Sequence, residues 1–290
     1  MSNNRVIRKF HVRKINQNIH MKNYFIYIFA VALAITGCST NAITNRSQLK
    51  LFSESTLQQE ALTQYRGFLS ENRVLSSSAN KDAEMVKRVG NRIATAITTY
   101  YSGKGMSSQL DGYQWEFNLV NDAQVNAWCM PGGKVVVYTG LLQVTQNEAA
   151  LAVVMGHEIT HAIAEHGNER MSQATLAQGL QVAGDLFTSN RAQANSIFNN
   201  IYGPAAQVGV LLPNSRKQEL EADRYGLIFA ALAGYNPREA VPFWQRMAKA
   251  GENGQKPPVF LSSHPADDQR IAQLKKYMPE ALKYYKPVKR

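Results

Sequence analysis

Residues 153–163 read VVMGHEITHAI, which places two histidines and one glutamate inside an apolar run. His157 and His161 are four residues apart, so on a helix they share one face and both imidazoles can reach a single ion. Glu158 follows the first histidine, where its carboxylate can take a proton from a water molecule on that ion. The H-E-x-x-H spacing therefore predicts a zinc site that activates water.

The sequence around this motif predicts one long buried helix. Residues 146–170 contain no proline and only two glycines, and Thr145 and Asn147 can both serve as N-caps. A buried polar group without a partner costs about 1–3 kcal/mol, so polar groups on an apolar helix indicate a functional role. The alternative is that both histidines are ordinary core residues with satisfied hydrogen bonds.

The acidic segment 219–223, ELEAD, is the best source of a third ligand. Glu219 and Asp223 share a helix face, whereas Glu221 is turned about 200 degrees from Glu219. This face offers one ligand and a second carboxylate, and Asp223 suits the second role, accepting the outer N–H of a ligand histidine. His166 falls on the opposite face of a continuous helix from the first histidine and is not expected to be a ligand. The alternative is an ordinary solvated acidic start of a helix.

Four segments resemble the motifs of one peptidase family in the family's order: NAWCMPGG at 126–133, HEITH at 157–161, ELEAD at 219–223 and SHPADDQR at 263–270. This is the gluzincin family of the CaaX prenyl endopeptidase, HtpX and the periplasmic proteins BepA and LoiP, and the chain resembles a LoiP-like lipoprotein metalloprotease in particular. The resemblance implies an α+β, mainly helical zincin-like metallopeptidase domain with a small β-sheet and an HExxH active-site helix. It also implies one Zn²⁺ per chain, with Glu219 as the third ligand beside His157 and His161.

By the same resemblance, His264 approaches the metal and is a catalytic candidate beside Glu158. Pro265 restricts it to extended conformations, so we expect it in a loop. Two roles are open: donating a hydrogen bond to the developing oxyanion, or occupying the fourth position of zinc in a resting state. From its position alone, the alternative is a surface histidine without a role.

The N-terminus predicts export and lipid attachment. Residues 24–37 form an apolar stretch of 14 residues before Cys38, short of the roughly 20 that span a bilayer. This predicts cleavage before Cys38 and lipidation of its thiol; an uncleaved short membrane anchor is the alternative. Ser39 follows Cys38, and a residue other than Asp at this position resembles the outer-membrane sorting signal of enterobacterial lipoproteins. The resemblance implies an outer-membrane, periplasm-facing location. The expected organisation is a leader extension at 1–20, a lipoprotein signal peptide at 21–37, a tether at 38–51, a zinc metallopeptidase domain at 52–280 and a basic tail at 281–290.

Charge and cysteine content limit the classes of molecule that the chain can bind and the disulfides that it can form. Residues 1–37 hold six Lys and Arg and no acid, so the net charge falls from +11 to +5 without them, with 26 basic against 21 acidic residues. No basic stripe interleaved with aromatic residues remains, which argues against a nucleic-acid partner. With Cys38 lipidated, Cys129 has no cysteine to pair with and is expected as a small core residue.

Strand patterns suggest how a substrate is held. Residues 131–133, PGG, are expected to turn two strands at 126–130 and 134–138 into a hairpin, after a strand at 113–120. An exposed edge there can accept a peptide as an added strand, unless the sheet only covers the helix. The expected substrate strand consists of Asn126, Ala127, Trp128, Cys129 and Met130. Helices are expected up to residue 101 and at 265–277, and 171–212 is expected to form loosely packed helices and a mobile cover.

Together these features predict a zinc endopeptidase with membrane contact through the N-terminal lipid alone. The resemblance to BepA and LoiP implies that its substrates are unfolded or misassembled envelope proteins. The rival is a noncatalytic, zinc-bound assembly or chaperone-like lipoprotein of the outer membrane with the same fold. Glutamate at position 158, rather than Gln or Ala, favours the enzyme. The sequence carries no code for the cleavage site or the oligomeric state.

Overall fold

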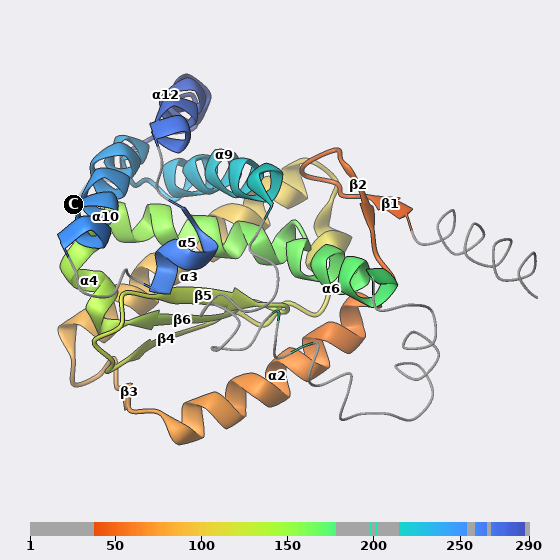
Figure 1. Cartoon of the computed structure of the whole chain (residues 1–290), viewed down its shortest axis with the longest axis horizontal. Coiled ribbons are helices and arrows are strands. Elements are labelled where there is room, and N and C mark those ends of the chain that lie inside the picture. The colour runs from red at the N-terminus through yellow and green to blue at the C-terminus, as the bar shows by residue number, and fades with distance from the viewer. Residues whose placement is uncertain are drawn as a thin grey trace, which may run out of the picture.

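The computed structural model describes residues 38–177, 198, 201, 215–253, 259–265 and 268–287. Within these ranges the chain forms a mainly helical α+β domain around a four-stranded sheet, which confirms the predicted fold class (Figure 1). The predicted leader and signal peptide lie outside the described residues, and so does the predicted mobile cover from 178 onward, apart from two isolated positions. None of the described helices is both long and apolar enough to cross a membrane.

The predicted helices and strands are present, together with elements that were not predicted. The helices are α2 (Glu54–Glu71), α3 (Lys81–Gly103), α4 (Thr139–Thr145), α5 (Glu148–Ile163), α6 (His166–Ala177), α9 (Arg216–Leu232), α10 (Ala240–Asn253), α11 (Val259–Ser263) and α12 (Asp268–Leu282), with short 3-10 helices at Ser107–Leu110 and Pro237–Glu239. The strands are β1 (Cys38–Thr40), β2 (Ser47–Leu49), β3 (Val74–Leu75), β4 (Glu116–Val120), β5 (Ala127–Met130) and β6 (Lys134–Tyr138). The elements that were not predicted are β1, β2, β3, α4, α10 and α11. The last helix begins and ends later than predicted.

The four-stranded sheet separates two cores. Its order is β3-β4-β6-β5, with β4 and β6 parallel and the other pairs antiparallel. The predicted hairpin joins β5 and β6, and Gly132 and Gly133 supply the positive φ values, 78° and 79°, that its turn requires. Trp128 and Met130 pack toward α2, whereas Ala127 faces the main core around α3 and α5. Figure 1 shows α2 and α5 on opposite sides of this sheet, with β5 at the edge of the described strands.

Helix α5 carries the H-E-x-x-H motif through the main core. Asn147 caps it, its side chain accepting a hydrogen bond from the backbone N–H of Ala150 at 2.8 Å. The predicted continuation of this helix to residue 170 is wrong. The helix ends at Ile163, Glu165 adopts a left-handed conformation with φ 55°, and a separate helix, α6, begins at His166. His166 therefore does not point away on the far face of α5.

Two glycines bring α5 and α9 into close contact. A Cβ on Gly226 of α9 would lie 2.8 Å from the backbone nitrogen of His157 in α5. A Cβ on Gly156 would lie 2.8 Å from the carbonyl oxygen of Gly226. The helix that carries the histidines and the helix that carries the acidic cluster thus meet backbone to backbone, directly beside the first histidine.

Residues 38–51 are folded, so the prediction of a tether is wrong. β1 and β2 pair as an antiparallel hairpin, and Asn41, Ile43 and Gln48 are buried. The side-chain amide of Gln48 donates to the carbonyl of Ala164 at 2.9 Å, just past the C-terminal end of α5. Such carbonyls have no partner within a helix, so the hairpin satisfies groups that would otherwise be orphaned. The predicted lipidation site, Cys38, is exposed at the start of β1, and its lipidation remains a prediction.

Candidate active site

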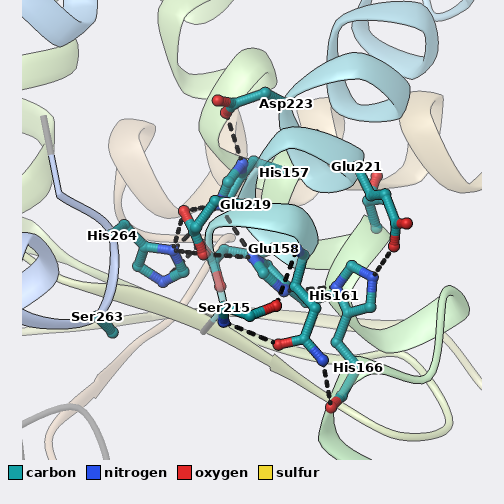
Figure 2. A network of polar contacts seen from close by, with 12 residues as sticks. His157, Glu158, His161, His166, Ser215, Glu219, Glu221, Asp223, Ser263 and His264 are labelled. Carbon is teal, nitrogen blue, oxygen red and sulfur yellow. Dashed lines mark hydrogen bonds and ion pairs between the residues drawn. The ribbon is translucent and has the colours of Figure 1, made fainter. Parts of the chain in front are cut away.

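Four side chains from three separate segments of the sequence converge beside the α5–α9 crossing. They are His157 and His161 from α5, Glu219 from α9, and His264, which follows α11 (Figure 2). One donor atom from each lies within 4.8 Å of all the others, and all four residues are buried. The structure thus brings together the three predicted ligands and the predicted catalytic candidate His264.

The geometry of this cluster shows which atoms face its centre. Nε2 of His161 lies 3.1 Å from Nε2 of His157 and 3.3 Å from Oε1 of Glu219. Nδ1 of His264 lies 3.0 Å from both carboxylate oxygens of Glu219 and 3.1 Å from Nε2 of His157. Imidazole nitrogens and carboxylate oxygens in a set of four are the donors that zinc prefers. The donor set therefore fits one zinc ion.

Glu158 lies beside the cluster with an unused oxygen. Its Oε1 is buried without a hydrogen-bond partner among the described residues, and Nε2 of His264 is 3.6 Å away. A buried carboxylate oxygen without a partner is costly, so its presence here indicates a place for water or substrate. This arrangement fits a group that accepts a proton beside the metal.

Burial and charge set the protonation of these groups. Burial lowers the pKa of His161 well below its usual value, which leaves a neutral ring that can act as a ligand. Burial acts to raise the pKa of Glu219, but the charges of His264 and Arg270 outweigh it and hold that pKa well below its usual value. Burial raises the pKa of Glu158, which moves this carboxylate toward the range of a general base.

Asp223 lies on the outer side of His157, as predicted. Its Oδ1 is 3.0 Å from Nδ1 of His157, the nitrogen that faces away from the cluster (Figure 2). Burial acts to lower the pKa of His157, but the charge of Glu219 and the hydrogen bonds with Asp223 and Glu219 raise it to about 9. Arg270 donates from Nε to Asp223 at 2.8 Å and lies 3.4 Å from the centre of the Trp244 ring. Asp223 can therefore fix both the orientation and the tautomer of the first ligand.

Two residues that were not predicted to belong to the site, His166 and Glu221, lie on the outer side of His161. Nδ1 of His161 lies 2.9 Å from Nδ1 of His166, and Nε2 of His166 lies 2.9 Å from Oε2 of Glu221. On an unbroken helix these rings would diverge, and the break at Glu165 turns His166 back toward His161. No periodic pattern in the sequence marks that break, so helix-face reasoning placed His166 and Glu221 away from the site.

The predicted substrate strand lies next to the active-site helix. β5 packs against α5 and pairs with β6 on one side, as the last strand of the described sheet. Asn126 precedes the strand and is buried, while Trp128 and Met130 point into the core near α2. Cys129 is half-buried against the main core, in line with its expected packing role.

Comparisons with known proteins point to one family. The family model described as "Peptidase family M48" matches residues 80–278. The mitochondrial metalloendopeptidase OMA1 of Saccharomyces cerevisiae is 36% identical over 185 residues, covering 62% of this chain and 51% of that protein. Human OMA1 is 28% identical over 291 residues, covering 97% of this chain and 53% of that protein. The beta-barrel assembly-enhancing protease of Yersinia pestis is 32% identical over 164 residues, covering 54% of this chain and 33% of that protein.

These relatives correct one prediction and limit what can be carried over. The predicted periplasm-facing, lipid-anchored outer-membrane location is contradicted, because the OMA1 relatives are named as mitochondrial proteins in yeast, plants and animals. The chain spans about half of the length of the yeast and human OMA1 relatives and about a third of the Arabidopsis and Yersinia proteins. Their activities and substrates therefore enter only as support for a proposal.

Proposed function

The chain belongs to peptidase family M48, and from that premise we propose that it is a zinc-dependent endopeptidase whose general base is Glu158. Membership confirms the family resemblance and the metallopeptidase class predicted from the sequence. The observation that carries the proposal is the buried set of two histidines and one glutamate, beside which Oε1 of Glu158 has no hydrogen-bond partner among the described residues.

Each group has a distinct task in this proposal. His157, His161 and Glu219 would hold the zinc ion, which would supply Lewis-acid polarisation of a water molecule and of the scissile carbonyl. The carboxylate of Glu158 accepts the proton of the attacking water and delivers it to the leaving amine. Because burial raises the pKa of Glu158, this carboxylate holds a proton more readily than an exposed glutamate does.

His264 is proposed to occupy the fourth coordination position in a resting state. Its Nδ1 faces the same centre as the three ligands, 3.0 Å from Glu219 and 3.1 Å from His157, which favours this role over oxyanion binding. A histidine in that position blocks the place of the attacking water, so His264→Ala should raise basal cleavage while zinc stays bound. If His264 instead stabilises the oxyanion, the same change should lower turnover by roughly 10²- to 10³-fold.

The proposed substrate is an extended segment of an unfolded or misassembled protein. β5 is the last strand of the described sheet and packs against α5, the helix that carries Glu158. A folded protein seldom offers such a free extended segment, and this restricts cleavage to unfolded chains. The Yersinia relative is named a beta-barrel assembly-enhancing protease, and this name supports a link between proteolysis and protein assembly.

The test is metal analysis combined with proteolysis of an unfolded protein such as reduced casein. The purified chain should contain one zinc per molecule and cleave casein at internal bonds. Glu158→Gln should keep the zinc and lose the cleavage, since the amide cannot accept the proton. Wild type and His264→Ala could both bind zinc and yet show no cleavage that Glu158→Gln abolishes. That result would instead support the noncatalytic zinc-bound rival.

A further inference from the structure

The two histidine ligands of α5 are supported in different ways. Nδ1 of His157 meets a carboxylate directly, that of Asp223 at 3.0 Å. Nδ1 of His161 meets a second imidazole, that of His166 at 2.9 Å, and the carboxylate of Glu221 lies one step further out (Figure 2). The support of His161 is therefore longer and depends on more side chains than that of His157.

Glu221, at the outer end of this series of contacts, sets which nitrogen of each imidazole carries the proton. If Nε2 of His161 binds the metal, the proton of His161 is on Nδ1 and is donated to Nδ1 of His166. His166 must then carry its own proton on Nε2, where it donates to Oε2 of Glu221 at 2.9 Å. An ionised Glu221 in its present place thus selects the tautomer of His166 that His161 needs.

Arg46 holds Glu221 in that place. Its guanidinium donates from Nε to Oε1 of Glu221 at 2.6 Å and from Nη2 to Oε2 at 3.0 Å. The same Nη2 donates to Oε2 of Glu169 at 2.7 Å, and Gln218 donates to that carboxylate as well, also at 2.7 Å. Arg46 is thus a cation between two carboxylates, and without it Glu169 and Glu221 would repel each other and move apart.

The position of Arg46 is in turn fixed by the N-terminal hairpin. Arg46 directly precedes β2, and its backbone carbonyl accepts a hydrogen bond from the N–H of Asn41 at 2.9 Å. Asn41 and Gln48 reach the carbonyls of Ile163 and Ala164 at the end of α5, the turn after His161. The hairpin therefore holds both the end of the ligand-bearing helix and the guanidinium that supports the second ligand.

We propose that Arg46 is a positioning residue for the metal site, acting through Glu221 and His166 to fix the ring orientation and tautomer of His161. This inference rests on the proposed zinc site. Arg46 lies outside residues 80–278, the part of the chain that the family model matches, so the active site extends into the N-terminal hairpin. The side chains of Arg46, Glu221 and Glu169 are 12%, 15% and 8% exposed, so solvent screens these charges only partly.

A matched control separates positioning from general anchoring of the hairpin. Lys50, in the same segment, pairs with Glu165 between α5 and α6 at 2.6 Å, with side chains that are 17% and 11% exposed. Lys50→Gln therefore removes a cation of similar burial that pairs with Glu165 at the break between α5 and α6, but it leaves in place the side-chain contacts of His166 with His161 and Glu221. Both Arg46→Gln and Lys50→Gln should lower the urea unfolding free energy of the metal-free chain.

The experiment measures the zinc dissociation constant of the full chain by competition with a chromophoric chelator at fixed pH. Arg46→Gln and Glu221→Gln should weaken zinc binding by about 3- to 30-fold. Loss of a residue that contacts a metal ligand directly weakens binding by about 10- to 100-fold, and Arg46 and Glu221 act through further side chains. Lys50→Gln should leave it within about 2-fold of wild type. The visible absorption of the Co²⁺-loaded chain should change in Arg46→Gln and Glu221→Gln but not in Lys50→Gln, because it reports ligand geometry rather than stability.

Arg46→Lys provides a rescue test that a purely structural role would not pass. An ammonium is a point charge that can stay with Glu221 but cannot bridge two carboxylates in a fork, so zinc affinity should recover in part. Equal zinc affinities and Co²⁺ spectra for Arg46→Gln, Glu221→Gln and wild type would overturn the positioning role. Equal losses in Arg46→Gln and Lys50→Gln would do the same. Absence of zinc binding by the wild-type chain would overturn the proposed function itself, which is a distinct result.

Discussion

Gly226→Ala tests whether the contact between α5 and α9 sets the geometry of the metal site. Gly226 lies where α9 touches the backbone of His157, so the substitution replaces none of the proposed ligand residues. It alters only the spacing of the two helices. His157 and His161 come from one helix and Glu219 from the other. Any widening of the crossing therefore acts directly on the distance between the ligands.

The size of the effect follows from the contact distances. The new Cβ would lie 2.8 Å from the nitrogen of His157 and 2.9 Å from its Cα, at least about 0.5 Å short of van der Waals contact. Both atoms belong to the backbone, so the clash is relieved only by moving a helix. Ligand distances in a zinc site vary by about 0.2 Å, so a shift of this size should weaken zinc binding about 10- to 100-fold.

Stability should fall as well, because the clash outweighs the helix propensity of alanine. Overpacking of this kind costs about 1–3 kcal/mol, whereas replacing a glycine inside a helix by alanine gains about 0.5–1 kcal/mol. Gly67→Ala in α2 provides the control, since nothing lies within 4 Å of its added Cβ. Gly67→Ala should raise the unfolding free energy slightly and leave the zinc affinity unchanged.

The assays are chelator competition for zinc and urea unfolding of the metal-free chain. Gly226→Ala should lose affinity and stability together, while Gly67→Ala should lose neither. The reasoning would be refuted if Gly226→Ala bound zinc as tightly as wild type. That result would mean that α9 can slide along α5 without changing the distance from Glu219 to the histidines.

Three further changes test other parts of the site and fold. Glu219→Gln should lose most of its zinc by metal analysis, because the ionised ligand becomes a neutral amide; stoichiometric zinc would exclude Glu219 as a ligand. Asp223→Asn should weaken zinc binding about 10- to 100-fold in chelator competition, and an unchanged affinity would exclude its supporting role. Burial, and to a lesser extent the charge of Glu165, raises the pKa of Glu54 to about 8, so the folded chain favours protonated Glu54. The folding free energy that this protonated form contributes is lost as the pH rises through that value. Urea unfolding should therefore show Glu54→Gln gaining roughly 2–4 kcal/mol over wild type between pH 5 and pH 9, and a constant difference would show that Glu54 ionises freely.

Local rules of sequence account for most of the metal site. Spacing by four residues places His157 beside His161 and Glu219 beside Asp223, because 3.6 residues complete a helical turn wherever the helix lies. The turn at Gly132 and Gly133 likewise follows from the residues themselves, since glycine adopts positive φ without strain. The resemblance to a peptidase family supplied what spacing alone left open, the choice of Glu219 and the approach of His264 to the site.

The sequence alone misplaced the features that depend on contacts between distant segments. The end of α5 at Ile163 coincides with hydrogen bonds from Asn41 and Gln48, more than 100 residues away, to the carbonyls at that end. Helical periodicity describes one segment at a time. It cannot predict that a distant segment supplies hydrogen-bond donors to the carbonyls at the end of a helix. The same limitation made residues 38–51 read as a tether.

Spacing thus determined that His157 shares a helix face with His161 and that Glu219 shares one with Asp223, because those signals lie within single helical turns. The family resemblance implied that the two faces form one site. Tertiary structure alone decided where the active-site helix stops, how closely α9 approaches it at Gly226, and that His166, Glu221 and Arg46 stand behind His161. The physical reason is that packing distances and shared hydrogen bonds belong to pairs of segments, and their energies exist only after those segments have met.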